Sequence, residues 1–184
     1  MNAAGTLTAT LDEIASWVES EIAANLEYLV PPDEGAVEDI ELTWSNPSVF
    51  SSFVPSVERL PEGSNQSPSI LVQLLGGEDS LSEDRELRIR LLLTIWSPGH
   101  FVDGSIIRSN DGWRDLFNGL SAIVTAVESA ETIAGCAVKR DNGVRYGFYE
   151  IDRQIPDMYP YWMGQVDFEL RRLPHANKRF NTLL

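Results

Sequence analysis

Residues 158–172 read MYPYWMGQVDFELRR, and this stretch decides the fold. From residue 162 onward, apolar and polar residues alternate, which is typical of a β-strand with one face in the core. We expect Trp162, Gly164, Val166, Phe168 and Leu170 to share the core face. We expect Met163, Gln165, Asp167, Glu169 and Arg171 to face water or a neighbour. Tyr159, Pro160 and Tyr161 precede the alternation, so they form either a packed turn that caps the sheet or a contact between protomers.

Other strands are predicted on either side of this one. Residues 85–96, RELRIRLLLTIW, place Leu87, Ile89, Leu91, Leu93 and Ile95 on one face. Residues 68–75, PSILVQLL, are continuously apolar, which indicates burial on both faces. These two segments predict a hairpin with an acidic tip at 76–84. Two further strands, 136–139 and 144–151, are expected around an Asp-Asn-Gly turn at 141–143.

Two helices are predicted. Residues 11–29 carry apolar side chains at three- and four-residue steps, and Thr10 with Glu13 fits a capping box before Pro31 and Pro32 end the helix. Residues 111–130 form the second helix, with Asn110 or Asp111 as its cap. Its buried stripe is predicted to consist of Leu116, Leu120, Ile123, Val124 and Val127.

The remaining segments are irregular. Residues 31–67 are rich in turns and carry two short extended pieces, 40–44 and 54–60; residues 97–110 are expected to be a loop. The order predicts an α+β fold, in which a mostly antiparallel or mixed sheet of about four to six strands packs against the two helices. We expect one domain over 1–174, comprising an N-terminal region at 1–67 and a core at 68–174, followed by a flexible C-terminal tail at 175–184.

Charge is distributed asymmetrically along the chain. The formal net charge is −14, which argues against general binding of nucleic acid through phosphates. Residues 1–58 contain no Lys or Arg, whereas the chain from residue 171 onward carries Arg171, Arg172, Lys178 and Arg179 and no acid. An acidic head and a basic tail attract each other within one chain or between neighbours, or they are simply a solvated face and a loose tail.

No catalytic, cofactor or metal site is predicted. His100, His175 and the single cysteine, Cys136, are far apart in the sequence, so they do not form a zinc-binding pattern. The phosphate-binding loop and the nucleophile elbow are both absent, and the acids of 78–84 lack the glycine and glutamate of a calcium loop. We therefore expect a protein that is not an enzyme. With no secretory signal and no long apolar run, we expect it to act in the reducing interior of a cell and not in a membrane.

The second half of the chain resembles a known family. A strand that opens with proline (PSILVQLL), a long alternating strand (RELRIRLLLTIW), a loop, a helix (GWRDLFNGLSAIVTAV) and a closing strand introduced by aromatics and glycine (YPYWMGQVDFEL) follow in that order. This order resembles the tail terminator, or tail-completion, proteins of long-tailed bacteriophages, over roughly residues 55–172. The first 55 residues depart from that family's pattern.

The resemblance implies a structural role in the virion. In that family a small α+β domain closes into a homo-oligomeric ring, a hexamer, on the tail tube. The ring stops tube polymerisation and joins the tail to the head–neck connector, while DNA passes through the lumen without specific binding. The resemblance further implies assembly in the host bacterial cytoplasm and no catalytic residue or cofactor.

In such a ring, candidate interface residues are Tyr159, Tyr161, Arg171, Arg172, Lys178 and Arg179, and candidate lumen-facing residues are Asp167 and Glu169. Ring contacts join two different faces of a protomer, so the charge asymmetry suits them. Three alternatives stay open: a head-completion or stopper protein of the connector, an acidic module that mimics DNA, and an enzyme with scattered acids.

Overall fold

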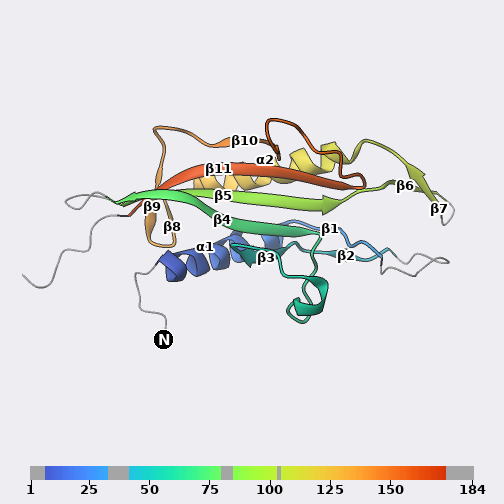
Figure 1. Ribbon diagram of the computed structural model, residues 1–184, viewed down its shortest axis with the longest axis horizontal. Coiled ribbons are helices and arrows are strands. Elements are labelled where there is room, and N and C mark those ends of the chain that lie inside the picture. Colours follow the sequence, from blue (N-terminus) through green and yellow to red (C-terminus); the bar gives the residue numbers. More distant parts are fainter. Residues whose placement is uncertain (1–6, 33–41, 80–84, 103–104, 173–184) are drawn as a thin grey trace, which may run out of the picture.

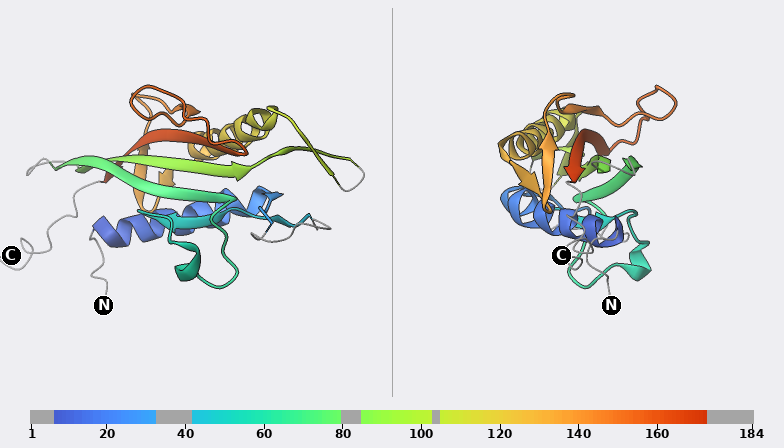
Figure 2. Two further views of the ribbon diagram at one scale, coloured as in Figure 1. Left: turned by 45° about the vertical axis from the view of Figure 1, so that its right-hand side comes forward. Right: turned by 90° about the vertical axis from the view of Figure 1, so that its left-hand side faces the viewer.

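The computed structural model describes residues 7–32, 42–79, 85–102 and 105–172 (Figure 1). Seven of its strands form one mixed sheet. Six strands follow the order β3 (Ser48–Ser51), β4 (Ser69–Asp79), β5 (Arg85–Trp96), β11 (Tyr161–Arg172), β9 (Cys136–Lys139) and β8 (Thr132–Ile133), and the seventh, β10 (Arg145–Phe148), also pairs with β11. The sheet is antiparallel except for the parallel pair β3–β4, and it is strongly curled (Figure 2). The predicted α+β class is confirmed.

The pairing of β5 with β11 forms the centre of the sheet. Twelve consecutive residue pairs run from Tyr161 opposite Trp96 to Arg172 opposite Arg85. The predicted alternation of β11 is confirmed, because Val166, Phe168 and Leu170 are buried and the residues between them are not. On β5, the residues of the predicted core face are at most 2% exposed: Leu87, Ile89, Leu91, Leu93 and Ile95. Each fully buried side chain of this size contributes about 1.5–3 kcal/mol to the free energy of folding.

The second edge of β11 is covered by two strands in turn. β9 pairs with residues 169–171 and β10 with residues 164–167. The chain from 136 to 148 therefore runs along one edge of β11, interrupted at 140–144, where Gly143 has a φ of 64°. The two strands predicted around the Asp-Asn-Gly turn exist, but they do not pair with each other because β11 takes both as partners.

Both helices pack on the same face of the sheet. α2 (Gly112–Ser129) lies against β5, β10 and β11, and its buried residues Leu116, Leu120, Ile123 and Val127 match the predicted stripe. α1 (Leu7–Glu21) lies against β3 and β4. In the described part of the chain, neither helix is long and apolar enough to cross a membrane.

The N-terminal helix differs from its prediction. It begins at Leu7 and ends at Glu21, and it is followed by the short 3₁₀ helix η1 (Ala23–Asn25). The Asn46 side chain donates hydrogen bonds to the carbonyls of Ala23 and Leu26, at 3.2 and 2.6 Å, and so satisfies backbone acceptors of η1 and of the residue that follows it. The apolar stripe predicted a longer helix, because Ile22 and Leu26 also pack against the core although they lie outside the α-helix. The predicted capping box is wrong: Thr10 lies inside the helix and is buried.

The opposite face of the sheet carries a smaller apolar cluster. Phe50, Leu71 and Leu92 are buried there, with Met163 and Tyr149 packed against them. Burial of both faces of β4 is confirmed for residues 69–72 but not for Leu75, which is 48% exposed.

The predicted extended piece at 54–60 is wrong, because residues 57–59 form the 3₁₀ helix η2 (Val57–Arg59). Of the piece at 40–44, residues 40 and 41 lie outside the described residues.

Two small hairpins project from the sheet at one end (Figure 1). β1 (Tyr28–Leu29) pairs with β2 (Trp44–Ser45), and β6 (Gly99–Val102) pairs with β7 (Ser105–Arg108). The second pair occupies the segment 97–110 that was predicted to be a loop. We call residues 99–102 with 105–108 the arm, because they extend beyond the end of β5 and away from the helices.

Substitution of Gly119, in the middle of α2, tests how closely this helix packs against the sheet. Glycine costs about 1 kcal/mol relative to alanine inside a helix. A methyl group here would overlap the Tyr28 hydroxyl and the Leu93 side chain. We therefore expect Gly119→Ala to lower the free energy of unfolding by about 1–3 kcal/mol in urea denaturation, despite its better helix propensity. Ser121→Ala, on the exposed side of the same helix, is the control and should leave stability equal or higher; a stabilised Gly119→Ala would contradict this packing.

Candidate functional site

The predicted site residues lie along β11. Tyr161 begins this strand and Tyr159 lies two residues before it, and Arg171 and Arg172 are at its end. Asp167 and Glu169 lie between them on the face away from the helices. Lys178 and Arg179 lie outside the described residues. The structure therefore separates the candidate interface residues into two groups at opposite ends of one long strand.

The beginning of β11 is a packed turn. The Tyr159 hydroxyl donates a hydrogen bond to the Pro98 carbonyl, and the Ser97 amide donates to the Pro160 carbonyl at 3.0 Å. The Tyr161 amide donates to the Met158 carbonyl at 2.9 Å. The turn thus joins the start of β11 to the segment that links β5 to the arm, and the Tyr161 side chain remains 37% exposed.

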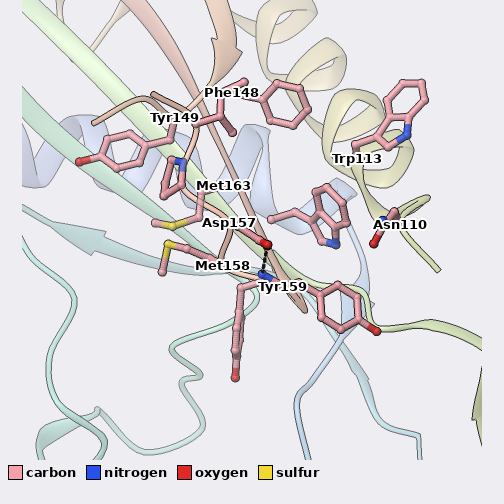
Figure 3. A pocket seen from close by; sticks show the side chains of 12 residues that line it. Asn110, Trp113, Phe148, Tyr149, Asp157, Met158, Tyr159 and Met163 are labelled. Atoms are coloured by element: carbon pink, nitrogen blue, oxygen red, sulfur yellow. Dashed lines mark hydrogen bonds between the residues drawn. The ribbon is translucent and has the colours of Figure 1, made fainter. Parts of the chain in front are cut away.

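An open aromatic pocket lies beside this turn, with a volume of about 680 Å³ (Figure 3). We call it the aromatic pocket. Its walls come from the beginning of α2, the end of β10, the segment 149–160 and the start of β11. Six aromatic side chains line it: Trp113, Phe148, Tyr149, Tyr159, Tyr161 and Trp162.

Close packing between α2 and β11 sets the floor of the aromatic pocket. A Cβ at Gly112 would overlap the indole of Trp162, so glycine permits this approach. The Trp162 indole N–H donates a hydrogen bond to the Ser97 carbonyl at 3.0 Å. On the other wall, the ring of Phe117 contacts those of Trp113 and Phe148 edge-on, with centroids 6.2 and 5.1 Å away. The pocket is therefore held by fixed rings rather than by loop side chains alone.

The chemistry of the aromatic pocket is that of binding. Asp157 is the single charged residue in its lining, and its carboxylate accepts a hydrogen bond from the Tyr159 amide at 3.2 Å (Figure 3). Ile155 and Met158 are 59% and 44% exposed on its rim. A concave, mainly apolar surface with few polar groups suits an apolar or aromatic side chain of a ligand. The sequence drew attention to Tyr159 and Tyr161 but missed Trp113 and Phe148, which are distant in the chain and reach the pocket only through the fold.

The middle of β11 carries a ladder of opposite charges. Asp167 lies opposite Arg90 of β5, and the guanidinium donates two hydrogen bonds to the carboxylate, at 2.7 and 2.8 Å. These hydrogen bonds raise the pKa of Arg90 above its usual value. In the same register Glu169 lies opposite Arg88 and Arg171 opposite Glu86. Cross-strand pairs of opposite charge stabilise an antiparallel sheet.

Lys139 of β9 joins the charge ladder to the next strand. Its ammonium group lies 2.9 Å from Glu86 and 3.2 Å from Glu169. Asn142 donates a hydrogen bond to Glu169 at 2.7 Å, and this bond, together with Lys139, lowers the pKa of Glu169. The two candidate lumen carboxylates are therefore engaged within the protomer, and a surface made of them is a neutralised network rather than a bare acidic strip.

The end of β11 touches the N-terminal helix. The Arg172 guanidinium donates a hydrogen bond to the Thr10 hydroxyl at 3.1 Å. A base of the C-terminal part of the chain is thus bonded to the acid-rich N-terminal region inside one protomer. Arg171 is exposed on the other face.

Known catalytic chemistry finds little support in the described residues. They contain no group of three or more His, Cys, Asp or Glu side chains placed to hold a metal ion. Cys136 is fully buried, and burial raises the pKa of its thiol, which disfavours the thiolate. His100 is exposed on the arm, and His175 lies outside the described residues.

Comparison with known proteins does not assign the chain to a family. No protein-family model matches it. A search of curated proteins also finds no significant match.

The Arg90–Asp167 pair tests the charge ladder. The two side chains are 22% and 25% exposed, and two parallel hydrogen bonds join them. In a double-mutant cycle with Arg90→Gln and Asp167→Asn, we expect a coupling free energy of about 1 kcal/mol from urea denaturation. The matched control is the exposed pair Asp111–Arg114, for which we expect no measurable coupling. Equal coupling in the two cycles would mean that this pair adds no more to stability than an exposed ion pair does.

Proposed function

We propose that this protein is a structural subunit of a bacteriophage tail that acts as a tail terminator. Copies associate head to tail into a ring on the end of the tail tube, stop its polymerisation and present a surface to the head–neck connector. The strands and the helix on which the family resemblance rests correspond to β4, β5, α2 and β11, in that order, while the expected loop before the helix forms β6 and β7.

The observation that carries this proposal is the arm. Its two strands project from the body, and Val102 and Ile107 are 47% and 55% exposed on it (Figure 1). A two-stranded hairpin is marginally stable by itself in water. Exposed apolar residues on such a hairpin are typical of a surface that is buried when subunits assemble.

The difference between the two ends of the protomer supports a ring. The arm and the aromatic pocket lie at the end where β5 stops and β11 begins, while Arg171 and Arg172 lie at the other end. Two different surfaces on one protomer allow a heterologous contact, and such contacts generate closed rings when the rotation between subunits closes.

The charge ladder supports a lumen that lets DNA pass. Each lysine or arginine that neutralises a phosphate adds salt-dependent affinity for nucleic acid. On this face Arg90 and Lys139 are paired with carboxylates of the same chain. The same pairing disfavours the DNA-mimic alternative, since Asp167 and Glu169 do not form a free acidic surface.

The proposal predicts control of tube length. When the phage's own tail-tube protein polymerises in vitro, addition of this chain at a small molar ratio should cap growing ends and shorten the tubes seen by electron microscopy. Replacing both apolar side chains, with Val102→Ser and Ile107→Ser, should weaken capping at least tenfold. Each apolar side chain that is no longer buried in the contact costs on the order of 1 kcal/mol or more of binding free energy.

The matched control is Arg108→Gln, an exposed position on the other face of the same hairpin, and it should cap like the unaltered chain. Tubes of the same length with and without the protein, at every ratio tested, would end the terminator proposal. Binding along the sides of tubes, or to connector proteins alone, would favour the stopper or another neck protein instead.

A further inference from the structure

We propose that a second pocket, between the β1–β2 hairpin and α2, binds an arginine side chain of a partner protein. We call it the acidic pocket. The proposed function does not use this pocket, so the inference goes beyond that function. Two carboxylates, three aromatic rings and an amide are part of its lining: Glu27, Asp115, Tyr28, Trp44, Trp96 and Asn118.

The acidic pocket is formed where several elements meet at the end of β5. Its walls come from β1, β2, the last residues of β5 and the first half of α2. These elements meet at the end of the sheet from which both small hairpins project (Figure 1). The volume of the pocket is about 310 Å³, which is enough for one long side chain.

The charge of the acidic pocket favours a cation. Its lining contains Glu27 and Asp115 and no Lys, Arg or His. Within the part of the chain that the structure describes, neither carboxylate forms an ion pair. The Ser97 hydroxyl donates a hydrogen bond to Asp115 at 3.2 Å, which leaves its negative charge in place. Burial and the nearby Asp115 carboxylate raise the pKa of Tyr28 to about 12, so this charge acts directly on the wall of the pocket.

The aromatic rings favour a guanidinium over other cations. Trp44 is 56% exposed and lies opposite Leu29 in the β1–β2 hairpin, so backbone pairing holds it at the wall. A guanidinium is planar, stacks on an indole and donates several hydrogen bonds to carboxylates. An ammonium is a compact and strongly hydrated ion that lacks this flat surface. An arginine therefore matches both the indole and the carboxylates of the acidic pocket.

The surface around the acidic pocket indicates that the arginine belongs to a protein. Trp44, together with Val102 and Ile107 of the arm, is exposed at the same end of the sheet (Figure 1). Tryptophan and arginine are enriched among the residues that contribute most to contacts between proteins. Exposed apolar side chains beside a carboxylate-lined pocket suit an arginine that projects from a partner better than they suit a free cation.

Titration of the full-length chain with short peptides tests the choice of ligand. The probe is acetyl-Gly-Arg-Gly-amide, and binding is followed by the NMR shifts of the Trp44 indole and the Asn118 side-chain amide. We expect it to bind about tenfold more tightly than the same peptide with neutral citrulline, and more tightly than the lysine peptide. Equal affinity for the arginine and citrulline peptides, or for the arginine and lysine peptides, would overturn the proposal.

Two variants with the same change of charge test the place of binding. Asp115→Asn should weaken binding of the arginine peptide about tenfold, because it removes the carboxylate and keeps the size of the side chain. The matched control is Glu128→Gln, which is exposed farther along α2 and should leave the affinity unchanged. Equal affinities of both variants, whether lowered or not, would overturn the proposal.

Other occupants of the acidic pocket are detected in the absence of peptide. A Trp44 indole resonance that moves with protein concentration would place a second copy in the pocket. One that moves in Arg179→Gln would place the C-terminal segment of the chain there. Either result would overturn the assignment to a partner protein.

The inference and the terminator proposal fail separately. A chain that binds the arginine peptide and caps no tube would support the acidic pocket and contradict the terminator. A chain that caps tubes and does not bind the peptide would support the terminator and overturn the inference.

Discussion

The structure depends on the antiparallel pairing of β5 with β11. Twelve residue pairs in one register bring segments about seventy positions apart into contact, and side chains on a strand alternate between faces. A shift of one residue would send Val166, Phe168 and Leu170 to water and Asp167 and Glu169 into the core. The charge ladder on one face and the apolar core on the other therefore specify the same register. α2, the arm and the aromatic pocket are positioned from these two strands, and α1 lies against β3 and β4, of which β4 pairs with β5.

From this register follows the asymmetry of the protomer. The strand that begins beside six aromatic side chains ends at Arg171 and Arg172, and its middle is electrically neutralised by Arg90 and Lys139. One end is thus suited to apolar contact and the other leads into a basic segment. A protomer with two unlike ends favours directional association, in which each copy offers one end to the next.

Periodicity predicted the elements whose partners are fixed by burial. The alternation of 85–96 and 162–170 and the stripe of 111–130 are confirmed, because one apolar face of each meets the core. Local patterns failed where a distant residue decides the structure. The Asn46 side chain donates hydrogen bonds to the carbonyls of Ala23 and Leu26, just beyond the end of α1 at Glu21. β11 pairs with both β9 and β10, so these two strands do not form a hairpin with each other. Only part of the aromatic pocket could be predicted from the sequence, because Trp113 and Phe148 join Tyr159 through the fold. Ion pairs such as Arg90–Asp167 could not be predicted, because they depend on the register between the strands.

The central claim is that this protomer is built for directional assembly on the end of a tail tube. The most direct measurement is cryo-electron microscopy of tubes grown with the full-length chain, at a resolution that traces β5 and β11. The account predicts a closed ring at the tube end, with the arm of each copy on the next and β5 and β11 facing the lumen. A tube end without this chain, or copies related by a two-fold axis that joins identical ends, would contradict it.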